Sequence, residues 1–567
     1  MDPIEKVDTA TVAHREQVSD PVRLQEDATV RVENFDGFSL PLVASYIAVC
    51  FMLFNQLIIV ISSGVFSGNI AEALDGSSER TWLSLSATIV SAALCIPISK
   101  ASDYWGRKWL LVSAGAAAFV GTIVTARAET WGVALGGSIL CGYSQGAQPL
   151  LYAVAAETVP RQWRSSSLAF MNIGASVAGV YSLLVGSTLI KNSADGWRTF
   201  YYINTGLAGA SLIVITICYN PPTRELQKLP QLEKLKQLDW MGFFISTVAV
   251  VLFSVGLSLA KNPYSWSSPE VLCPLIIGIV FGFILFTHQR WLNPRGMFHH
   301  DLFSKDKRNV ILASFFAANS YIAFEDSVLY NTDVFKSDLK VCTSYFAAIV
   351  VTILYGIFAA RFSYLRETLI VAFIFYVAFN VCMSTLTTGS GNALWAYCAI
   401  LGIGIPLSIA PLFTVGQLAA PIPTIALLSG VMLTLRSLGG SIGMAACTAI
   451  FSSQTTKYLV PDTSKAALEA GLSPDSLQEF IQAIMSGNAE AAAEVPSASM
   501  EIIMAATDAL KEAYVKSFRY LWVFSACASV LGLLGVYFIR NPVEELTKHV
   551  DAPIRETSTK AVDLESK

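Results

Sequence analysis

Apolar segments of about 20 residues recur along the chain, and a helix of that length crosses the roughly 30 Å hydrocarbon core of a membrane. Only 14% of the 567 residues are charged, and 53% are hydrophobic. Soluble domains carry roughly 25% charged residues, so this chain cannot cover an ordinary soluble surface. The sequence therefore predicts an all-α integral membrane protein. The small net charge of −4 gives no reason to expect nucleic acid as a partner.

The apolar segments predict fourteen membrane-spanning helices. Lys and Arg are concentrated in the short loops on the same side as the N-terminus. Because cytoplasmic loops carry such an excess, we expect both termini in the cytoplasm. The expected spans are residues 39–63, 80–101, 108–127, 131–156, 166–190, 198–219, 239–260, 270–290, 309–331, 341–361, 366–386, 392–414, 424–451 and 518–540.

The segment between the last two spans, residues 453–516, is long, acidic and expected outside the cell. Within it, "SPDSLQEFIQAIMSGN" has Ser473 as a helix N-cap, Pro474 in the first turn and Gly487 at the end. Its apolar face consists of Leu477, Phe480, Ile481 and Ile484. We expect a short amphipathic helix that serves as a lid or strut, with substrate capture as the alternative.

The connection between the second and third spans reads "PISKASDYWGRKWLL". It resembles the loop signature of the major facilitator superfamily, Gly-x-x-x-Asp-Arg/Lys-x-Gly-Arg-Arg/Lys, although Ser99 and Tyr104 depart from it. The resemblance implies a cytoplasmic gate on the residues that match, which are Asp103, Gly106, Arg107 and Lys108.

Further stretches resemble the 14-spanner drug:proton antiporter branch of that superfamily, and within it the fungal trichothecene efflux pumps. They are "DGWRTFYYIN", "RSLGGSIGMAACTAIF", "LDWMGFFISTVAVVLFSVGLSLAKNPYSWSS" and "NPRGMFHHDLF". The resemblance implies a major facilitator fold of two six-helix bundles plus two linker helices. The chain then divides into a disordered cytoplasmic tail (1–38), an N-terminal bundle (39–219), a cytoplasmic loop (220–238), two linker spans (239–290), a C-terminal bundle (309–540, including 453–516) and a cytoplasmic tail (541–567).

Two charged positions of that branch are missing from this chain. Asn55 stands where an aspartate is common in the first span, and Gly142 stands where an arginine is common in the fourth. Proton coupling therefore does not follow from the resemblance alone.

By the same resemblance, the first, fourth, ninth and twelfth spans line a central cavity. The polar residues on them are the candidates for substrate contact, and the alternative is that they join helices by hydrogen bonds. These residues are Asn55, Gln56, Tyr143, Gln145, Gln148, Tyr152, Asn319, Tyr330 and Tyr397.

Two adjacent carboxylates, Glu325 and Asp326, lie in the ninth expected span. At 100° per residue, Asp326 shares a polar arc with Asn319 and Tyr330, whereas Glu325 faces a neighbouring helix or lipid. A buried carboxylate without a cation takes up a proton readily, so both are candidates for proton coupling. Arg436, the basic residue deep within a span, is the expected ion-pair partner of Glu325. The alternative is a pair of wetted carboxylates in an outer vestibule.

The leading functional hypothesis is a secondary active transporter that exports small amphiphilic toxins, secondary metabolites or drugs in exchange for protons. The alternatives are an importer of iron–siderophore complexes and a non-transporting receptor. We expect no enzyme activity, no cofactor and no metal site, because neither a metal-ligand spacing nor a phosphate-binding glycine loop occurs. The expected setting is a monomer in the lipid bilayer of the plasma membrane, with a vacuolar or vesicle membrane as the alternative.

Overall fold

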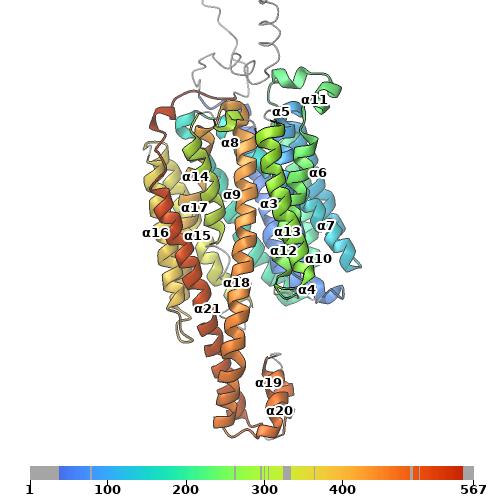
Figure 1. Ribbon diagram of the computed structural model, residues 1–567, viewed down its shortest axis with the longest axis vertical. Coiled ribbons are helices and arrows are strands. Elements are labelled where there is room, and N and C mark those ends of the chain that lie inside the picture. Colours follow the sequence, from blue (N-terminus) through green and yellow to red (C-terminus); the bar gives the residue numbers. More distant parts are fainter. Residues whose placement is uncertain are drawn as a thin grey trace, which may run out of the picture.

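The computed structural model describes residues 37–76, 80–193, 195–260, 264–293, 296–298, 300–303, 305–322, 334–362, 364–485, 489–496 and 498–552. Within these ranges the chain is almost entirely helical, and its β pairing consists of two isolated bridges. Long helices run roughly side by side along the vertical axis of the molecule (Figure 1). An all-α membrane fold was expected and is confirmed.

The first half of the chain forms one group of helices that pack against each other. They are α3 (Leu40–Val65), α4 (Ser67–Ala73), α5 (Trp82–Trp105), α6 (Arg107–Ala126), α7 (Trp131–Gly146), α8 (Gln148–Glu157), α9 (Arg164–Asn192) and α10 (Gly196–Cys218), with the 3-10 turn η2 (Arg161–Trp163) before α9. A connection with η3 (Glu225–Lys228) and α11 (Gln231–Gln237) leads to the paired helices α12 (Trp240–Leu259) and α13 (Pro269–Thr287).

The second half forms another group. It contains α14 (Lys307–Ile322), α15 (Val334–Ala359), α16 (Leu365–Ser384), α17 (Ala393–Ala419), α18 (Ile425–Glu469), α19 (Leu477–Met485), α20 (Ala489–Glu494) and α21 (Met500–Val536). We call the two groups the N-terminal and the C-terminal bundle.

Twelve helices in the described ranges are long and apolar enough to cross a membrane, so the expected count of fourteen is not confirmed. Two expected spans fall short of that length. The span at 131–156 is interrupted between α7 and α8, where Pro149 occupies the first turn of α8 and cannot donate a backbone hydrogen bond to the preceding turn. The span at 309–331 is described as α14, and its residues 323–331 lie outside the described ranges.

The expected outer segment 453–516 is largely a helical projection (Figure 1). Helix α18 continues through Glu469 and has 45 residues, about 67 Å at 1.5 Å per residue, so it extends well beyond a hydrocarbon core. The amphipathic helix was correctly expected, because Phe480, Ile481 and Ile484 of α19 are buried. They belong to a small separate core that also includes residues from the end of α18 and the start of α21.

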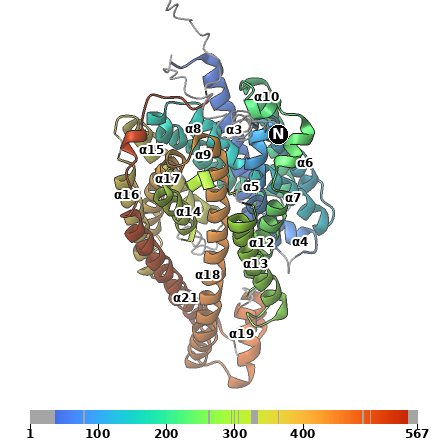
Figure 2. The same ribbon diagram turned by 45° about the horizontal axis from the view of Figure 1, so that its top comes forward.

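The ends of the described chain and this projection lie on opposite sides of the molecule (Figures 1 and 2). We call them the terminal side and the hairpin side. Helix α3 runs from the terminal to the hairpin side, and α5 returns.

Two seams join the bundles. Along the first, α9 packs against α15, with the Ser165 and Tyr355 hydroxyl oxygens 2.7 Å apart. Along the second, α5 packs against α18, where Thr434 Oγ1 donates to the Ala92 carbonyl at 3.0 Å. Gly430 permits the close approach, because a Cβ atom there would lie 2.9 Å from the Cys95 carbonyl oxygen.

Candidate functional site

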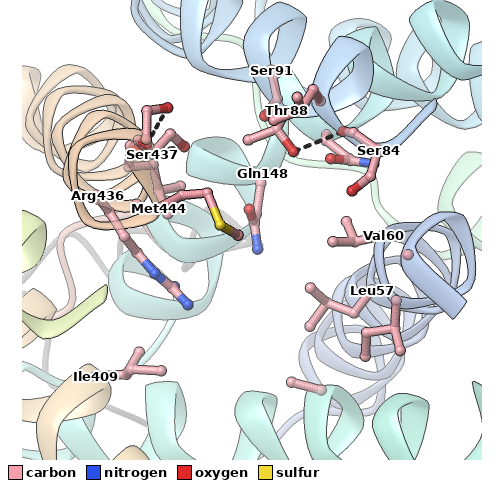
Figure 3. A pocket seen from close by; sticks show the side chains of 18 of the residues that line it. Leu57, Val60, Ser84, Thr88, Ser91, Gln148, Ile409, Arg436, Ser437 and Met444 are labelled. Atoms are coloured by element: carbon pink, nitrogen blue, oxygen red, sulfur yellow. Dashed lines mark hydrogen bonds between the residues drawn. The ribbon is translucent and has the colours of Figure 1, made fainter. Parts of the chain in front are cut away.

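A cavity of about 520 Å³ lies between the two bundles, and helices of both line it (Figure 3). On α3 the lining residues run from Leu57 to Gly64, and on α5 from Ser84 to Ser91. These stretches form the hairpin-side halves of the two helices. The cavity therefore occupies the hairpin-side half of the molecule.

On the terminal side of the cavity the bundles are packed together. The rings of Tyr152 on α8 and Phe413 on α17 stack with centroids 4.6 Å apart. Leu150, Leu151 and Leu428 are completely buried in the same core. The described conformation is therefore closed on the terminal side.

The cavity wall combines apolar side chains with hydroxyl groups. Ser84, Thr88 and Ser91 follow one face of α5 (Figure 3), and Thr88 Oγ1 donates to the Ser84 carbonyl at 3.0 Å. Leu57 and Val60 of α3 supply apolar wall beside them. Such a surface accommodates a ligand that is mainly apolar and carries a few polar groups.

Arg436 of α18 is the one ionised side chain among the described residues that line the cavity. Its guanidinium points into the space beside Gln148 (Figure 3) and interacts with the Tyr152 hydroxyl. Gln145 also lines the cavity, and its Nε2 is buried with no hydrogen-bond partner in the described part of the chain. The cavity thus presents hydrogen-bond donors to any acceptor group on a ligand.

Of the polar residues expected at the cavity, Gln145, Gln148 and Tyr152 line it. Gln56 instead joins two helices, since its Nε2 donates to the Ser144 carbonyl at 2.7 Å. The Tyr143 hydroxyl lies 2.9 Å from that of Ser113 on α6. These two residues follow the alternative interpretation, in which polar side chains connect helices.

Two more of the expected residues lie away from the cavity lining. Asn55 is buried within the N-terminal bundle, and Tyr397 packs against the main hydrophobic core. Neither position is among those that form the cavity wall.

The expected direction of the polar arc on the ninth span is not what α14 shows. Asn319 does not line the cavity. Instead, Asn319 packs against α21: a Cβ atom built at Gly532 would lie only 2.6 Å from Asn319 Oδ1. The Phe373 ring of α16 borders the same glycine. The helical wheel fixes angles around the helix axis but not which neighbour the polar arc meets. Glu325, Asp326 and Tyr330 lie outside the described residues.

The expected gate residues come together on the terminal side. Gly106 joins α5 to α6 with φ of 82°, a left-handed conformation that favours glycine. Asp103 is buried at the end of α5, and Lys108 Nζ donates to Asn220 Oδ1. Arg107 forms two hydrogen bonds to the Glu157 carboxylate, both at 2.5 Å.

Glu157 is the partner of Arg107 at this position, and the loop motif alone does not indicate it. It is completely buried at the end of α8 and also accepts a bond from Arg224 Nη2 at 2.8 Å. The signal in the sequence is "AAETVPR", an acidic residue at the end of an apolar span. Such a residue needs a cationic partner when it is buried.

Comparison with known proteins agrees with this geometry. Residues 5–565 match the model of a family described as the fungal trichothecene efflux pump (TRI12). The chain belongs to the fungal trichothecene efflux pump family. The resemblance inferred from the sequence motifs is therefore confirmed.

Individual members of this family and of related transporters are distant from the chain. The trichothecene efflux pump TRI12 of Fusarium sporotrichioides is 22% identical over 558 residues, which cover 94% of this chain and 92% of that protein. The efflux pump roqT of Penicillium rubens is 23% identical over 455 residues, covering 78% and 84%. The siderophore-importer alternative gains no support from relatives that bear such names.

The fold is that of a solved transporter. The structure of the major facilitator superfamily proton:xylose symporter XylE, bound to 6-bromo-6-deoxy-D-glucose, superposes with a TM-score of 0.50 and 13% identity. The match covers 90% of this chain and 98% of that one. At this identity the similarity establishes the major facilitator fold and nothing about the substrate.

Proposed function

We propose that the protein is a secondary active exporter of small amphiphilic molecules, such as toxins, secondary metabolites or drugs. The observation that carries the proposal is the cavity of about 520 Å³ between the two bundles, lined by both. A site at the interface of two halves can face either side of a membrane as the halves rock. The names of the efflux pumps in the family support export as the direction.

The composition of the cavity supports an amphiphilic substrate. Its apolar wall binds the body of such a molecule, and Arg436, Gln145 and Gln148 donate hydrogen bonds to its acceptor groups. A guanidinium has five donors, so Arg436 can contact Tyr152 and a substrate oxygen together.

The proposed topology has fourteen spans with both termini in the cytoplasm. The twelve helices that satisfy length and hydropathy, together with the interrupted α7–α8 pair and with α14, make up that number. The terminal side then faces the cytoplasm, and the hairpin projection lies outside the cell. We assign the protein to the plasma membrane as a monomer.

For the coupling ion we propose the proton. Asp326 is the main candidate for its carrier, and Glu325 with Arg436 is the second. Charges common in this branch are absent at Asn55 and Gly142. Asp326 and Glu325 lie well inside an expected span, whereas Asp239, Glu270 and Glu367 stand at the ends of theirs. The polar candidates Tyr330 and Asn319 accompany Asp326 on the same helical arc.

Transport by purified protein in vesicles tests proton coupling, and accumulation in cells tests the direction of transport. A pH gradient should drive flux of a fluorescent amphiphile in the wild type. Asp326→Asn should abolish pH-driven flux without loss of folded protein, whereas Asp475→Asn, an exposed residue of the projection, should behave as wild type. Flux that ignores the pH gradient in wild type would refute proton coupling. Expression in cells that raises rather than lowers accumulation of the amphiphile would refute export.

A further inference from the structure

The chain that follows α21 is fixed first to its own bundle. Asn541 Oδ1 accepts from the backbone N–H groups of Leu365 and Arg366 at 3.2 and 3.3 Å. Asn541 Nδ2 donates to Glu367 Oε2 at 2.7 Å. The start of the tail is therefore held at the terminal-side end of α16.

The tail then crosses to the N-terminal bundle and docks on the connection between α8 and α9. The backbone N–H of Arg161 donates to the His549 carbonyl, and that of Gln162 to the Thr547 carbonyl, both at 3.0 Å. The N–H of Ala552 donates to the Glu157 carbonyl, also at 3.0 Å. We call residues 545–552 the C-terminal strap.

Charged side chains fasten the strap. Asp551 binds Arg164 with one carboxylate oxygen and Arg161 with the other, the latter at 2.9 Å. The side chains of Asp551 and Arg164 are each only 1% exposed. Glu545 Oε2 lies 3.1 Å from Arg161 and 2.6 Å from Lys305, which belongs to the other half of the chain.

These contacts join two bodies that must separate on this side if the cavity is to open there. Buried and hydrogen-bonded ion pairs are costly to break one partner at a time. A contact that exists in only one of two conformations shifts the equilibrium toward that conformation. The strap satisfies that condition, because its anchor at Asn541 lies on one bundle and its docking site at Arg161 and Arg164 lies on the other.

We propose that the C-terminal strap is a built-in latch that holds the terminal side closed, and that it must release before the cavity can face that side. The proposal rests on the proposed transport function only in requiring two facing states. It assigns to residues after the last span a control over which state is populated.

Site-specific thiol labelling of the full-length protein in vesicles tests the latch without any substrate. A cysteine at Ser165, which is buried at the terminal-side seam, reports opening there. A cysteine at Ser84 in the cavity reports access from the hairpin side. The labelling of the native thiols is measured on the parent protein and subtracted.

Two variants release the latch, and one serves as the matched control. Asp551→Asn removes the buried charge, and a chain ending after Glu544 removes the strap. Glu544→Gln changes a neighbouring exposed carboxylate that has no ion pair among the described residues. Hydrogen exchange at Arg161 and Gln162, whose N–H groups bind the strap, verifies undocking in each variant.

In both releasing variants, labelling at position 165 should rise by about a hundredfold or more, on the scale of a broken buried ion pair, and labelling at position 84 should fall. Glu544→Gln should change neither. Unchanged labelling in the shortened chain, or a rise at both positions, would overturn the proposal. A rise at both positions indicates general loosening of the protein. Failure of substrate transport would refute the proposed function but leave this readout intact.

Discussion

Arg107 at the start of α6 and Glu157 at the end of α8 form a paired ion bridge in which both guanidinium Nη atoms lie 2.5 Å from a carboxylate oxygen. Arg224, from the connection to α11, binds the same carboxylate at 2.8 Å. Glu157 thus joins three segments of the N-terminal half on the terminal side of the cavity. Its backbone carbonyl also receives the strap through Ala552.

We expect Glu157→Gln to destabilise the protein by about 3–5 kcal/mol, because it leaves two arginines near a buried position without their counter-charge. Thermal unfolding of the purified protein measures the loss. Glu129→Gln, at an exposed carboxylate in the described structure, is the control and should be neutral. A wild-type melting curve for Glu157→Gln would show that the bridge adds nothing to stability.

Docking of the strap should depend on pH only under acidic conditions. Burial raises the pKa of Asp551, but the positive charges of Arg164 and Arg161 together lower it by more. The pKa therefore lies below its ordinary value. The stabilisation by a carboxylate of lowered pKa is present above the unfolded-state pKa, about 3.9, and is lost as pH falls through the folded-state pKa.

Protonation of Asp551 should begin only near the unfolded-state pKa of about 3.9. Hydrogen exchange at the Arg161 and Gln162 amides, corrected for the intrinsic rate, should therefore show constant protection from pH 8 to about 5. Protection should fall only below about pH 3.9. His549 Nε2, 3.6 Å from Asp551 Oδ1, is the other titratable group that faces this carboxylate, beside the two arginines. Loss of protection between pH 7 and 5 would show that protonation of Asp551 does not control docking.

The seam between α5 and α18 should not tolerate a side chain at Gly430. A Cβ there would lie 2.5 Å from Ser99 Oγ and 2.9 Å from the Cys95 carbonyl oxygen, so the two helices would have to separate. We expect Gly430→Ala to lower the melting temperature. Gly282→Ala on α13, where nothing lies within 4 Å, should be neutral or stabilising by up to about 1 kcal/mol. Equal effects of the two substitutions would contradict the close approach.

Arg436→Gln should weaken the binding of amphiphiles that carry a carbonyl or carboxylate oxygen. A hydrogen bond from a charged donor contributes about 1.5–3 kcal/mol, so the half-saturating concentration should rise about tenfold or more. Arg519→Gln, at an exposed arginine of α21, is the matched control. Transport with unchanged half-saturation in Arg436→Gln would show that the substrate does not bind the Arg436 side chain.

Much of this fold follows from local patterns along the chain. Hydropathy located the helices, and the loop around Gly106 and Arg107 indicated the superfamily. The expectation that the fourth span lines a cavity came from the family resemblance, and in the structure Gln145, Gln148 and Tyr152 of that span line the cavity between the bundles.

What local patterns could not provide are distances between segments far apart in the sequence. Asn319, the member of the expected polar arc that the structure describes, meets Gly532 of α21, and only the packing of neighbouring helices determines that contact. Helix α18 passes the point where its hydropathy falls because a second core forms around Phe480. The strap depends on ion pairs between residues nearly 400 positions apart.

The length of α18 has a mechanical consequence. One helix carries Gly430 at the seam, Arg436 in the cavity wall and Tyr458 in the projection, where the Tyr458 hydroxyl lies 3.2 Å from that of Tyr520. From Gly430 to Tyr458 the helix measures about 42 Å. Any tilt of α18 at the seam would therefore displace the projection farther than it displaces the cavity wall, because displacement grows with distance from the point of rotation.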